Sequence, residues 1–393
     1  MKSGAQSREH DPVVIVGTGL AGYTVARELR KLDREIPIVL ISRDDGCFYS
    51  KPMLSNALAM NKQPAALASF DASTMAAQLG ATVRVQCQVE RILPATHEVI
   101  ANGEHFSYRS LVLAMGADAR RPGIAGSGAA DILSINDLND YARFRQVLEG
   151  CKSVAILGAG LIGCEFANDL VSAGYVVSLI DPAPTPLSRL LPEKVGIAFA
   201  NELLGSGIHF YPGRNVTAME RSTTGYRLNL SDDAHIDADI VVSAIGLAPR
   251  TALAAAAGIQ VDQGIRTDAW CRTSVENIFA LGDCAAIDGK VQPYVLPIMH
   301  AARALARTLS GEPTRVQFPI MPIVVKTPAI PAVIVPPGGA GEWHVEAGMD
   351  DQRGALRAIF QNPGDDRPTG FALLGAATQG KALLIKTMTE ADS

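Results

Sequence analysis

Two glycine-rich segments offer the clearest chemistry in this sequence. Residues 17–22 read GTGLAG and residues 158–163 read GAGLIG, and each follows a short apolar run. In a GxGxxG turn the first glycine permits a tight bend, the second lets a pyrophosphate approach the backbone, and the third lets helix and strand pack closely. The amino end of the following helix adds free N–H groups and partial positive charge. Each segment therefore predicts a dinucleotide-phosphate site, built from Gly17, Gly19, Leu20, Ala21 and Gly22 in the first and from Gly158, Gly160, Leu161, Ile162 and Gly163 in the second.

A second apolar run follows each glycine-rich segment, and the residue at its end helps to determine which dinucleotide binds. Asp181 stands about 20 residues past the second glycine turn, where an acid binds both ribose hydroxyls and repels a 2′-phosphate. No arginine follows until Arg189, so this unit predicts NADH and not NADPH. The first unit has Ser42 at that point and Asp44 two residues later, and Asp44 is the candidate substitute for the missing acid. Two such sites predict two dinucleotides that exchange a hydride, as a nicotinamide and a flavin do.

The spacing of apolar residues predicts the strands and helices that position these turns. Residues 12–42 and 153–181 each read as strand, glycine turn, amphipathic helix and strand. Further buried strands are expected at 110–117, 240–246 and 277–285, and a helix is expected to run from His300 to a stop at Gly311. From about Glu312 prolines alternate with β-branched residues, which predicts antiparallel strands and a closing helix near 381–388.

This pattern predicts an α/β fold with two Rossmann-like, three-layer ββα/βα domains and a small α+β C-terminal domain. We expect residues 1–112 and 240–314 to form a discontinuous domain around the first glycine turn, and residues 113–239 to form a domain around the second. Residues 315–393 are expected to form the small C-terminal domain.

Composition excludes several classes of protein. A net charge of -5 argues against nucleic acid as a partner, because phosphate binding needs a basic face. No apolar run is long enough to span a membrane, and the polar first ten residues contain no secretory signal. The 6 cysteines form no CxxC pair, and each is expected to be a small buried side chain in a reducing cytoplasm. The 7 histidines show no metal-ligand spacing, so no metal is expected.

Five motifs together resemble the two-dinucleotide flavoprotein disulfide-reductase superfamily: GTGLAG, LVLAMGA, GAGLIG, VVSAIGLAPRT and TSVENIFALGDCA. The resemblance covers essentially the whole chain and implies that the first glycine turn binds FAD. It also implies that Asp283, after Gly282, binds the flavin ribitol, although Asp283 could instead be an exposed loop carboxylate. By the same resemblance Ala114 and Gly116 contact FAD and Gly246 contacts NAD.

The redox-active cysteine pair of that superfamily is absent from this sequence. NADH peroxidases and oxidases use one cysteine three residues before a proline; here Tyr49 stands three residues before Pro52, and Cys47 is displaced by two. The segment YSKPMLS instead resembles the branch that reduces one-electron carrier proteins. The WFWSDQ-type motif of ferredoxin reductases is missing, whereas MPIVVKTP, with Lys326, resembles rubredoxin reductases, including those that serve alkane hydroxylation and flavorubredoxin. Rubredoxin is therefore the expected partner. The resemblance implies that residues 1–112 and 240–314 bind FAD, that residues 113–239 bind NAD(H), and that residues 315–393 line the flavin and the docking side for the partner.

The resemblance also suggests candidate catalytic groups. Lys51 and Lys326 could stabilise negative charge on the reduced flavin, although either could be a solvated surface lysine. Glu165 is a candidate for a position near the nicotinamide carboxamide, or it could be an exposed carboxylate on the first helical turn. Lys51, Pro52 and Lys326 are also expected to contact FAD, as is Val295 within PYVLP. Three alternatives remain open: an NADH-dependent ferredoxin reductase, an NADH oxidase using oxygen or peroxide, and a flavoprotein without turnover.

Overall fold

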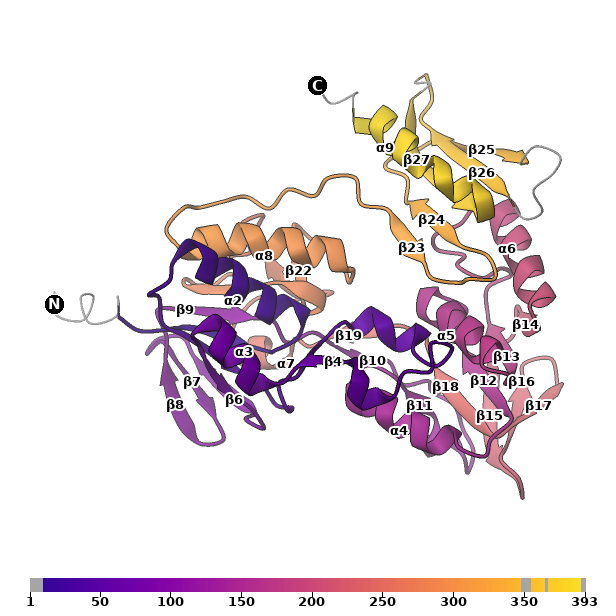
Figure 1. The fold of residues 1–393 in the computed structure, drawn as a ribbon, viewed down its shortest axis with the longest axis horizontal. Helices are drawn as coiled ribbons and strands as arrows, with labels where there is room; N and C mark the ends of the chain where they lie inside the picture. The colour runs from indigo at the N-terminus through magenta and orange to yellow at the C-terminus, as the bar shows by residue number, and fades with distance from the viewer. Residues whose placement is uncertain (1–9, 348–354, 365–366, 390–393) are drawn as a thin grey trace. The chain divides into compact units, whose positions relative to one another are not determined.

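The computed structural model describes residues 10–347, 355–364 and 367–389 (Figure 1). Contacts between residues divide the chain into two compact units. Unit 1 comprises the described residues of 1–51, 68–118 and 247–319, and unit 2 those of 52–67, 119–246 and 320–393.

Unit 1 is built on a parallel five-stranded sheet. Its order is β21 (Ile278–Ala280), β9 (Ser110–Leu113), β1 (Val13–Val16), β2 (Ile38–Ile41) and β5 (Thr82–Arg84). Val13 pairs with Ile38 on one side and with Ser110 on the other, so β1 is central and all four of its residues are buried. A strand buried on both faces needs apolar residues throughout, which explains the unbroken VVIV run.

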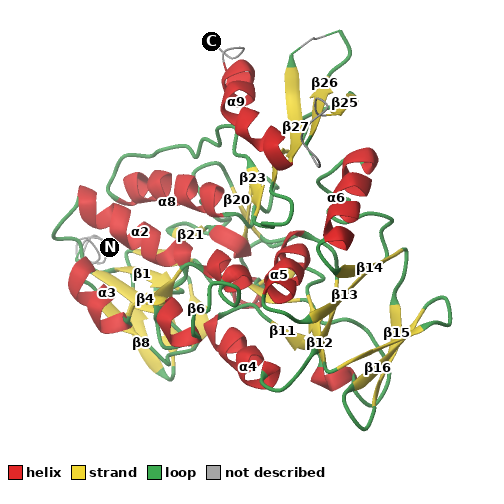
Figure 2. Cartoon of the chain, turned by 45° about the vertical axis from the view of Figure 1, so that its right-hand side comes forward, coloured by secondary structure: helices red, strands yellow, loops and turns green. Residues whose placement is uncertain are grey.

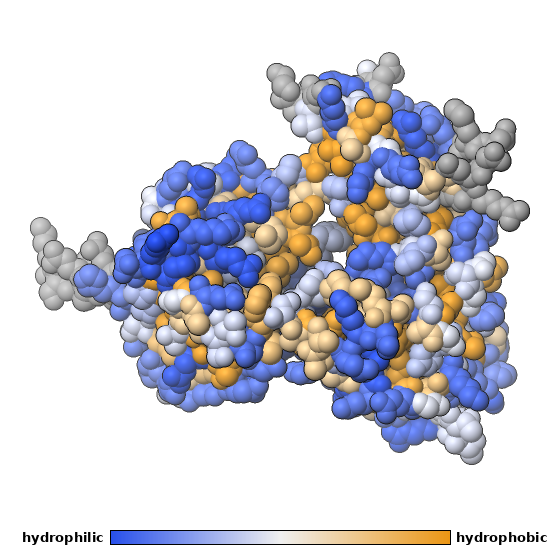
Figure 3. Space-filling view, viewed as in Figure 1, coloured by the Kyte–Doolittle hydropathy of each residue, from blue (hydrophilic) through white to orange (hydrophobic). Residues whose placement is uncertain are grey.

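Two layers cover the faces of this sheet. Helices α2 (Leu20–Leu32) and α8 (Val295–Leu309) pack against each other, and a three-stranded antiparallel sheet of β6 (Val89–Leu93), β7 (Glu98–Ala101) and β8 (Glu104–Ser107) shares the same apolar core. The outer face of α2 carries half-buried Arg27 and exposed Lys31 and is hydrophilic in Figure 3. Smaller elements complete the unit: β3 (Phe48–Tyr49), β4 (Ala68–Phe70), α3 (Ala72–Leu79), α7 (Ala252–Ala256), β20 (Ile265–Thr267) and β22 (Ala285–Ile287).

Unit 2 repeats this architecture. Its parallel sheet runs β11 (Leu133–Ser134), β18 (Ile240–Ser243), β12 (Ser153–Leu157), β13 (Val176–Asp181) and β14 (Ile208–Pro212). A second antiparallel sheet of β15 (Val216–Arg221), β16 (Tyr226–Leu230) and β17 (His235–Ala238) packs through its own cluster, and Figure 2 shows the helices of the unit, α4 (Leu138–Leu148), α5 (Leu161–Ser172) and α6 (Glu193–Gly205). The two predicted βαβ units and the α/β fold class are thus confirmed.

The C-terminal part is an antiparallel sheet with one helix. The strand order is β23 (Ile323–Val325), β24 (Ala332–Val335), β27 (Pro368–Leu374), β26 (Leu356–Gln361) and β25 (Glu342–Ala347). Helix α9 (Lys381–Thr389) buries Leu384 and Met388 in a core shared with Phe371, which confirms the expected closing helix. Contacts group this part with unit 2, so its expected boundary at residue 315 stays a prediction.

Several boundaries were predicted wrongly. The strands expected at 110–117, 240–246 and 277–285 end early, at Leu113, Ser243 and Ala280. Helix α8 begins at Val295 and not at His300. Pro297 was no obstacle, because a proline in the first turn of a helix lacks only an N–H that would have no partner within the helix.

Candidate functional sites at the two glycine turns

The first glycine turn, between β1 and α2, leaves no room for side chains at two of its three glycines. Gly17 has φ +114°, and a Cβ there would lie 2.3 Å from the carbonyl oxygen of Ala114. A Cβ on Gly22 would lie 1.9 Å from the oxygen of Gly17. Around Gly19, by contrast, no described atom lies within 4 Å of the Cβ position. The open side of the turn is therefore at the middle glycine, where a pyrophosphate would approach.

The second turn, between β12 and α5, has the same geometry. Gly158 has φ +102°, and its Cβ would lie 2.8 Å from the oxygen of Ala244. A Cβ on Gly163 would lie 1.9 Å from the oxygen of Gly158, while the space at Gly160 is open among the described atoms. Gly246, with φ +104°, is exposed just beyond the carboxyl end of β18. The structure thus places Gly246 after the strand next to β12 in the sheet.

The helices begin with free amino ends. Gly19 and Gly160 are the N-cap residues of α2 and α5, and in the described structure neither helix receives a side-chain cap. The first N–H groups of each helix, which include those of Leu20 and Leu161, are therefore available to an anion together with the partial positive charge of the helix end. This geometry fits a dinucleotide pyrophosphate at each turn.

The strand ends differ between the two units. In unit 2 the Asp181 carboxylate accepts hydrogen bonds from the N–H groups of Ala159, at 2.6 Å, and Ala183, at 2.7 Å. It therefore lies against the glycine turn, as predicted for a residue beside the ribose.

In unit 1 a chain of three side chains replaces this acid. The Thr18 hydroxyl donates to Ser42 Oγ at 2.6 Å, and the Ser42 hydroxyl donates to Asp44 Oδ1 at 2.5 Å. The N–H of Gly46 also donates to Asp44 Oδ1, at 3.0 Å. Asp44 is thus tied to the first glycine turn through Ser42 and Thr18, which supports its place at the ribose end of this site. Thr18 was not singled out from the sequence.

Asp283 lies beside the first helix. Gly282, with φ +78°, approaches α2 so closely that a Cβ would lie 2.9 Å from Ala21 Cβ. Burial raises the pKa of Asp283, and the positive charges of Lys51 and Arg250 oppose this rise. The alternative that Asp283 is an exposed loop carboxylate is therefore wrong.

Arg250 connects the neighbouring segments of unit 1. Its guanidinium donates to the Met115 carbonyl at 2.7 Å and pairs with Asp118 at 2.6 Å. Gly116, with φ +71°, lies next to this side chain, since a Cβ there would be 3.8 Å from Arg250 Nη1. The LVLAMGA and ALGD motifs are neighbours, because the Leu281 N–H donates to the Leu113 carbonyl at 3.2 Å, and the half-buried Asp283 feels the positive charges of Lys51 and Arg250.

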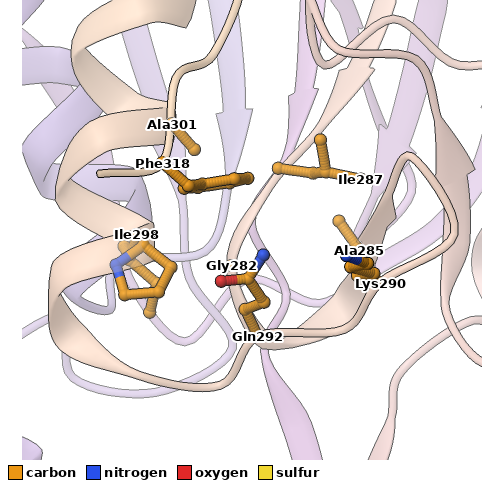
Figure 4. Close-up of a pocket in the computed structure, with 9 residues that line it drawn as sticks. Gly282, Ala285, Ile287, Lys290, Gln292, Ile298, Ala301 and Phe318 are labelled. Atoms are coloured by element: carbon orange, nitrogen blue, oxygen red, sulfur yellow. The ribbon is translucent and has the colours of Figure 1, made fainter. Parts of the chain in front are cut away.

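A small pocket opens beside Gly282 (Figure 4). Its lining is mostly apolar, with Lys290 and Gln292 as the polar members, and it is completed by Gly282, Ala285, Ile287, Pro297, Ile298, Ala301 and Phe318. Figure 4 shows the residues of α8 on one side and those around β22 on the other. Val295 lies at the start of the same helix and is 40% exposed, and its expected contact with the flavin stays a prediction.

Unit 2 contains a buried polar cluster around Glu165. This side chain is 1% exposed, so the alternative of an exposed carboxylate on the first turn of α5 is wrong. Glu165 accepts from the Ser55 hydroxyl at 2.5 Å and from the Lys326 N–H at 3.0 Å, and it pairs with Lys326 Nζ at 3.2 Å. Lys326 Nζ also donates to the Pro52 carbonyl and, at 3.3 Å, to Ser55 Oγ. Lys326 is 34% exposed, so it is not a fully solvated surface lysine.

Three members of this cluster were missed from the sequence: Ser55, Asn168 and Asp169. Asn168 Oδ1 accepts from the Ala329 N–H at 3.2 Å, and Asp169 accepts from the N–H groups of Leu58 and Ala59. A signal was available, because positions 165, 168 and 169 share one face of a helix whose remaining core positions are apolar.

The cysteines offer no relay for electrons. All six are free thiols, and four are buried: Cys87, Cys164, Cys271 and Cys284. Cys47 and Cys151 are only half-buried, so the expectation of burial was wrong for these two. Burial and the neighbouring Asp45 raise the pKa of Cys47 to about 11, which keeps this thiol protonated and unreactive near neutral pH.

Metal sites and membrane spans are both absent from the described residues. No group of three or more histidine, cysteine or acidic side chains there could hold a metal ion. Within the same residues no helix combines the length and apolarity needed to cross a membrane.

The chain is similar to known proteins over almost its whole length. Residues 11–307 match the pyridine nucleotide-disulphide oxidoreductase family, and residues 315–388 match the rubredoxin binding C-terminal domain. The chain is 44% identical to a rubredoxin-NAD(+) reductase of Alcanivorax borkumensis, over 96% of this chain and 98% of that protein. It is 46% identical to the protein of the same name in Acinetobacter baylyi, over 96% and 97% of the two chains.

More distant proteins share the fold. A nitric oxide reductase FlRd-NAD(+) reductase of Vibrio vulnificus is 35% identical over 95% of this chain and 97% of that protein. The crystal structure of the ferredoxin reductase for the CYP199A2 system from Rhodopseudomonas palustris superposes with a TM-score of 0.86 at 25% identity, over 96% of this chain and 95% of that one. On these grounds the chain belongs to the pyridine nucleotide-disulphide oxidoreductase family, in its rubredoxin-NAD(+) reductase branch.

Proposed function

We propose that this chain transfers electrons from NADH through FAD to rubredoxin, and that the reduced rubredoxin supplies a hydroxylase such as an alkane monooxygenase. The observation that carries the first step is the match of residues 315–388 to a rubredoxin binding domain, in a chain that also has two open glycine turns. The hydroxylase step rests on the resemblance of the VKTP segment to reductases that serve alkane hydroxylation.

Each unit has one cofactor in this proposal. In unit 1 the first glycine turn holds the FAD pyrophosphate, Asp44 and Ser42 lie at its ribose end, and Asp283 accepts from the ribitol hydroxyls. In unit 2 the second turn holds the pyrophosphate of NADH and Asp181 faces its adenosine ribose. When bound, FAD would supply the redox chemistry, because a flavin can accept two electrons from NADH as a hydride and pass them on one at a time. The proposed boundaries remain 1–112 and 240–314 for FAD, 113–239 for NAD(H) and 315–393 for the C-terminal domain.

The cations and acids of the chain tune this transfer. Lys51 and Lys326 would stabilise negative charge on the reduced cofactor, because a fixed cation in a partly dry site acts strongly on nearby charge. Glu165 would contact the nicotinamide carboxamide while it holds Lys326 through their ion pair. Because the Cys47 thiol stays protonated, electrons would pass to the partner without a cysteine relay.

The deciding experiment compares electron acceptors. We expect steady-state NADH oxidation to be fastest with rubredoxin and slower with a flavorubredoxin, a ferredoxin or oxygen. Fast reduction of a ferredoxin or of oxygen, together with no reduction of any rubredoxin, would overturn the assignment. Preference for a flavorubredoxin would retain the reductase but replace the hydroxylase as the downstream enzyme.

We also propose that the reaction takes place in the cytoplasm. Six free cysteines are typical of a reducing compartment. Fractionation of cells into cytoplasmic, periplasmic and membrane fractions, followed by detection of the protein, tests this placement.

A further inference from the structure

Helix α5 holds two distant chain segments through one buried polar face. Its residues Glu165, Asn168 and Asp169 are 1%, 4% and 2% exposed, and they stand three and four positions apart on the helix. Buried carboxylates are costly unless they are fully hydrogen-bonded. An apolar face would pack the helix at less cost, so these polar groups need a reason beyond packing.

Glu165 contacts both segments. It accepts from the Ser55 hydroxyl of the first segment and from the Lys326 N–H of the second. It also forms the ion pair with Lys326 Nζ. The position of the Lys326 ammonium therefore depends on how both segments are attached to α5.

Each segment then has a second attachment of its own. The 326–329 segment is held by Asn168, which accepts from the Ala329 N–H at 3.2 Å. The first segment is held by Asp169, which accepts from Leu58 at 3.1 Å and from Ala59 at 2.8 Å. A turn stiffens the second segment. The buried Thr327 hydroxyl donates to the Ile330 carbonyl at 2.6 Å, and the Ile330 N–H donates to the Thr327 backbone carbonyl at 3.0 Å.

We propose that Asn168 and Asp169 are positioning residues for electron transfer: Asn168 fixes the turn that carries Lys326, and Asp169 fixes the segment that supplies Ser55 and the Pro52 carbonyl to the Lys326 ammonium. The inference rests on the proposed role of Lys326 in the reaction with NADH. In this proposal helix α5, which begins at the second glycine turn, also holds Lys326 in place. Positional errors of about 1 Å in such support cost up to roughly 100-fold in rate.

The two attachments can be broken separately. Asn168→Leu keeps the size of the side chain but removes the acceptor for Ala329, whereas Asn168→Asp keeps that acceptor. Asp169→Asn weakens only the attachment of the first segment and serves as the matched variant. Each is made in the FAD-loaded full chain, and Lys326→Met provides the reference for loss of the lysine itself.

The first readout does not depend on activity. Acetylation of lysines by acetic anhydride, followed by mass spectrometry, reports the exposure of Lys326 against Lys31, whose side chain is 61% exposed. We expect Asn168→Leu to raise the acetylation rate of Lys326 several-fold, Asp169→Asn to raise it less, and Asn168→Asp to leave it near the parent value. An unchanged rate in both Asn168→Leu and Asp169→Asn would overturn the proposal, and Asp169→Asn alone decides if the leucine variant does not fold.

The second readout separates positioning from general stability. In stopped-flow measurements at saturating NADH, Asn168→Leu should slow flavin reduction roughly tenfold with little change in the NADH dissociation constant. Combined with Lys326→Met it should add almost nothing, since both changes remove the same interaction. Additive effects, or a loss confined to NADH affinity, would contradict the proposal. If the parent enzyme reduces no rubredoxin the proposed function fails, while the acetylation result still decides the placement of Lys326.

Discussion

The glycine turns of the two units have almost the same backbone but different polar surroundings. The N-cap residues Gly19 and Gly160 have φ and ψ of -72° and -172° in one case and -74° and -171° in the other. At the strand ends, however, Asp181 accepts from a backbone N–H of its turn, whereas Asp44 is joined to its turn through side chains, directly by the Thr18 hydroxyl at 3.4 Å and also through Ser42. Sterics therefore fix the backbone of the two glycine turns, while the side chains at the strand ends beside them are free to differ.

The helices that follow the turns differ even more. The buried face of α2 is apolar apart from Tyr23 and Thr24, whereas α5 buries Glu165, Asn168 and Asp169. Unit 1 contains 18 basic and 18 acidic residues and unit 2 contains 17 and 22, so the whole net charge of -5 resides in unit 2. The same βαβ architecture is therefore electrically neutral overall in unit 1 and acidic in unit 2, where its helix also buries polar side chains.

The largest effects should come from the third glycine of each turn. Gly22→Ala and Gly163→Ala both place a Cβ 1.9 Å from a carbonyl oxygen, so each should destabilise its unit by about 1–3 kcal/mol or more. Gly22→Ala should yield protein without FAD. Gly163→Ala should keep FAD but lose NADH oxidation. Absorbance at 450 nm measures the bound FAD and thermal melting measures the stability of each variant. Loss of FAD in both variants would contradict the assignment of FAD to unit 1 and NADH to unit 2.

Asp283→Ala should affect only the FAD side. In unit 2 the strand in the equivalent position of the sheet is β11, and the acid that follows it, Asp137, caps helix α4. Removing a charge-assisted hydrogen bond to the ribitol should cost about 1.5–3 kcal/mol, or roughly 10- to 100-fold in FAD affinity. Fluorescence titration of the deflavinated variant with FAD measures this loss. Equal affinity in variant and parent would show that Asp283 is not the ribitol ligand.

The middle glycines test the ligand and leave the fold intact. Gly19→Ala and Gly160→Ala meet no described atom within 4 Å, so their melting temperatures without ligand should match the parent. The added methyl group should weaken FAD at the first turn and NADH at the second by about tenfold, or 1.4 kcal/mol. A large fall in stability without ligand would contradict the open geometry of these turns.

Asp181→Ser gives unit 2 the strand-end residue of unit 1. The parent should prefer NADH over NADPH by about tenfold or more, because the carboxylate repels a 2′-phosphate. The variant should lose most of that preference. The ratio of kcat/KM for the two coenzymes measures it, and an unchanged ratio would assign coenzyme selection to other residues.

The smallest effect compares two acids with opposite pKa shifts. Burial raises the pKa of Asp169 on α5, so the ionised carboxylate destabilises the folded protein. This cost is absent below about pH 4, where the carboxyl is protonated in both the folded and unfolded protein, and it is complete above the raised pKa. Hydrogen bonds from Glu35 and Ile36 lower the pKa of Asp33 at the end of α2, so that carboxylate adds stability that is lost as pH falls. As the pH rises from 4 to 8, the melting temperature of Asp169→Asn should rise relative to that of the parent, whereas the melting temperature of Asp33→Asn should fall relative to that of the parent. Parallel trends in the two variants would contradict the assigned directions.

Much of the scaffold was predictable from local pattern. The runs VVIV and VAIL, the two turns and the strand that ends at Asp181 lie where periodicity and glycine spacing predict them. The antiparallel C-terminal strands and the helix at Lys381–Thr389 were likewise expected. The start of α8 was missed: the helix already begins at Val295, and Pro297 lies in its first turn.

The sequence by itself determined which backbone turns form, since steric limits at Gly17, Gly22, Gly158 and Gly163 act over a few neighbouring residues. Only the tertiary structure decided the partners of Glu165, because Ser55 and Lys326 are 110 and 161 positions away along the chain. It likewise decided that Thr18 and Ser42 connect Asp44 to the first turn. The physical reason is that a buried charge requires hydrogen-bond partners, and which groups supply them depends on how distant segments pack and not on the local pattern of residues.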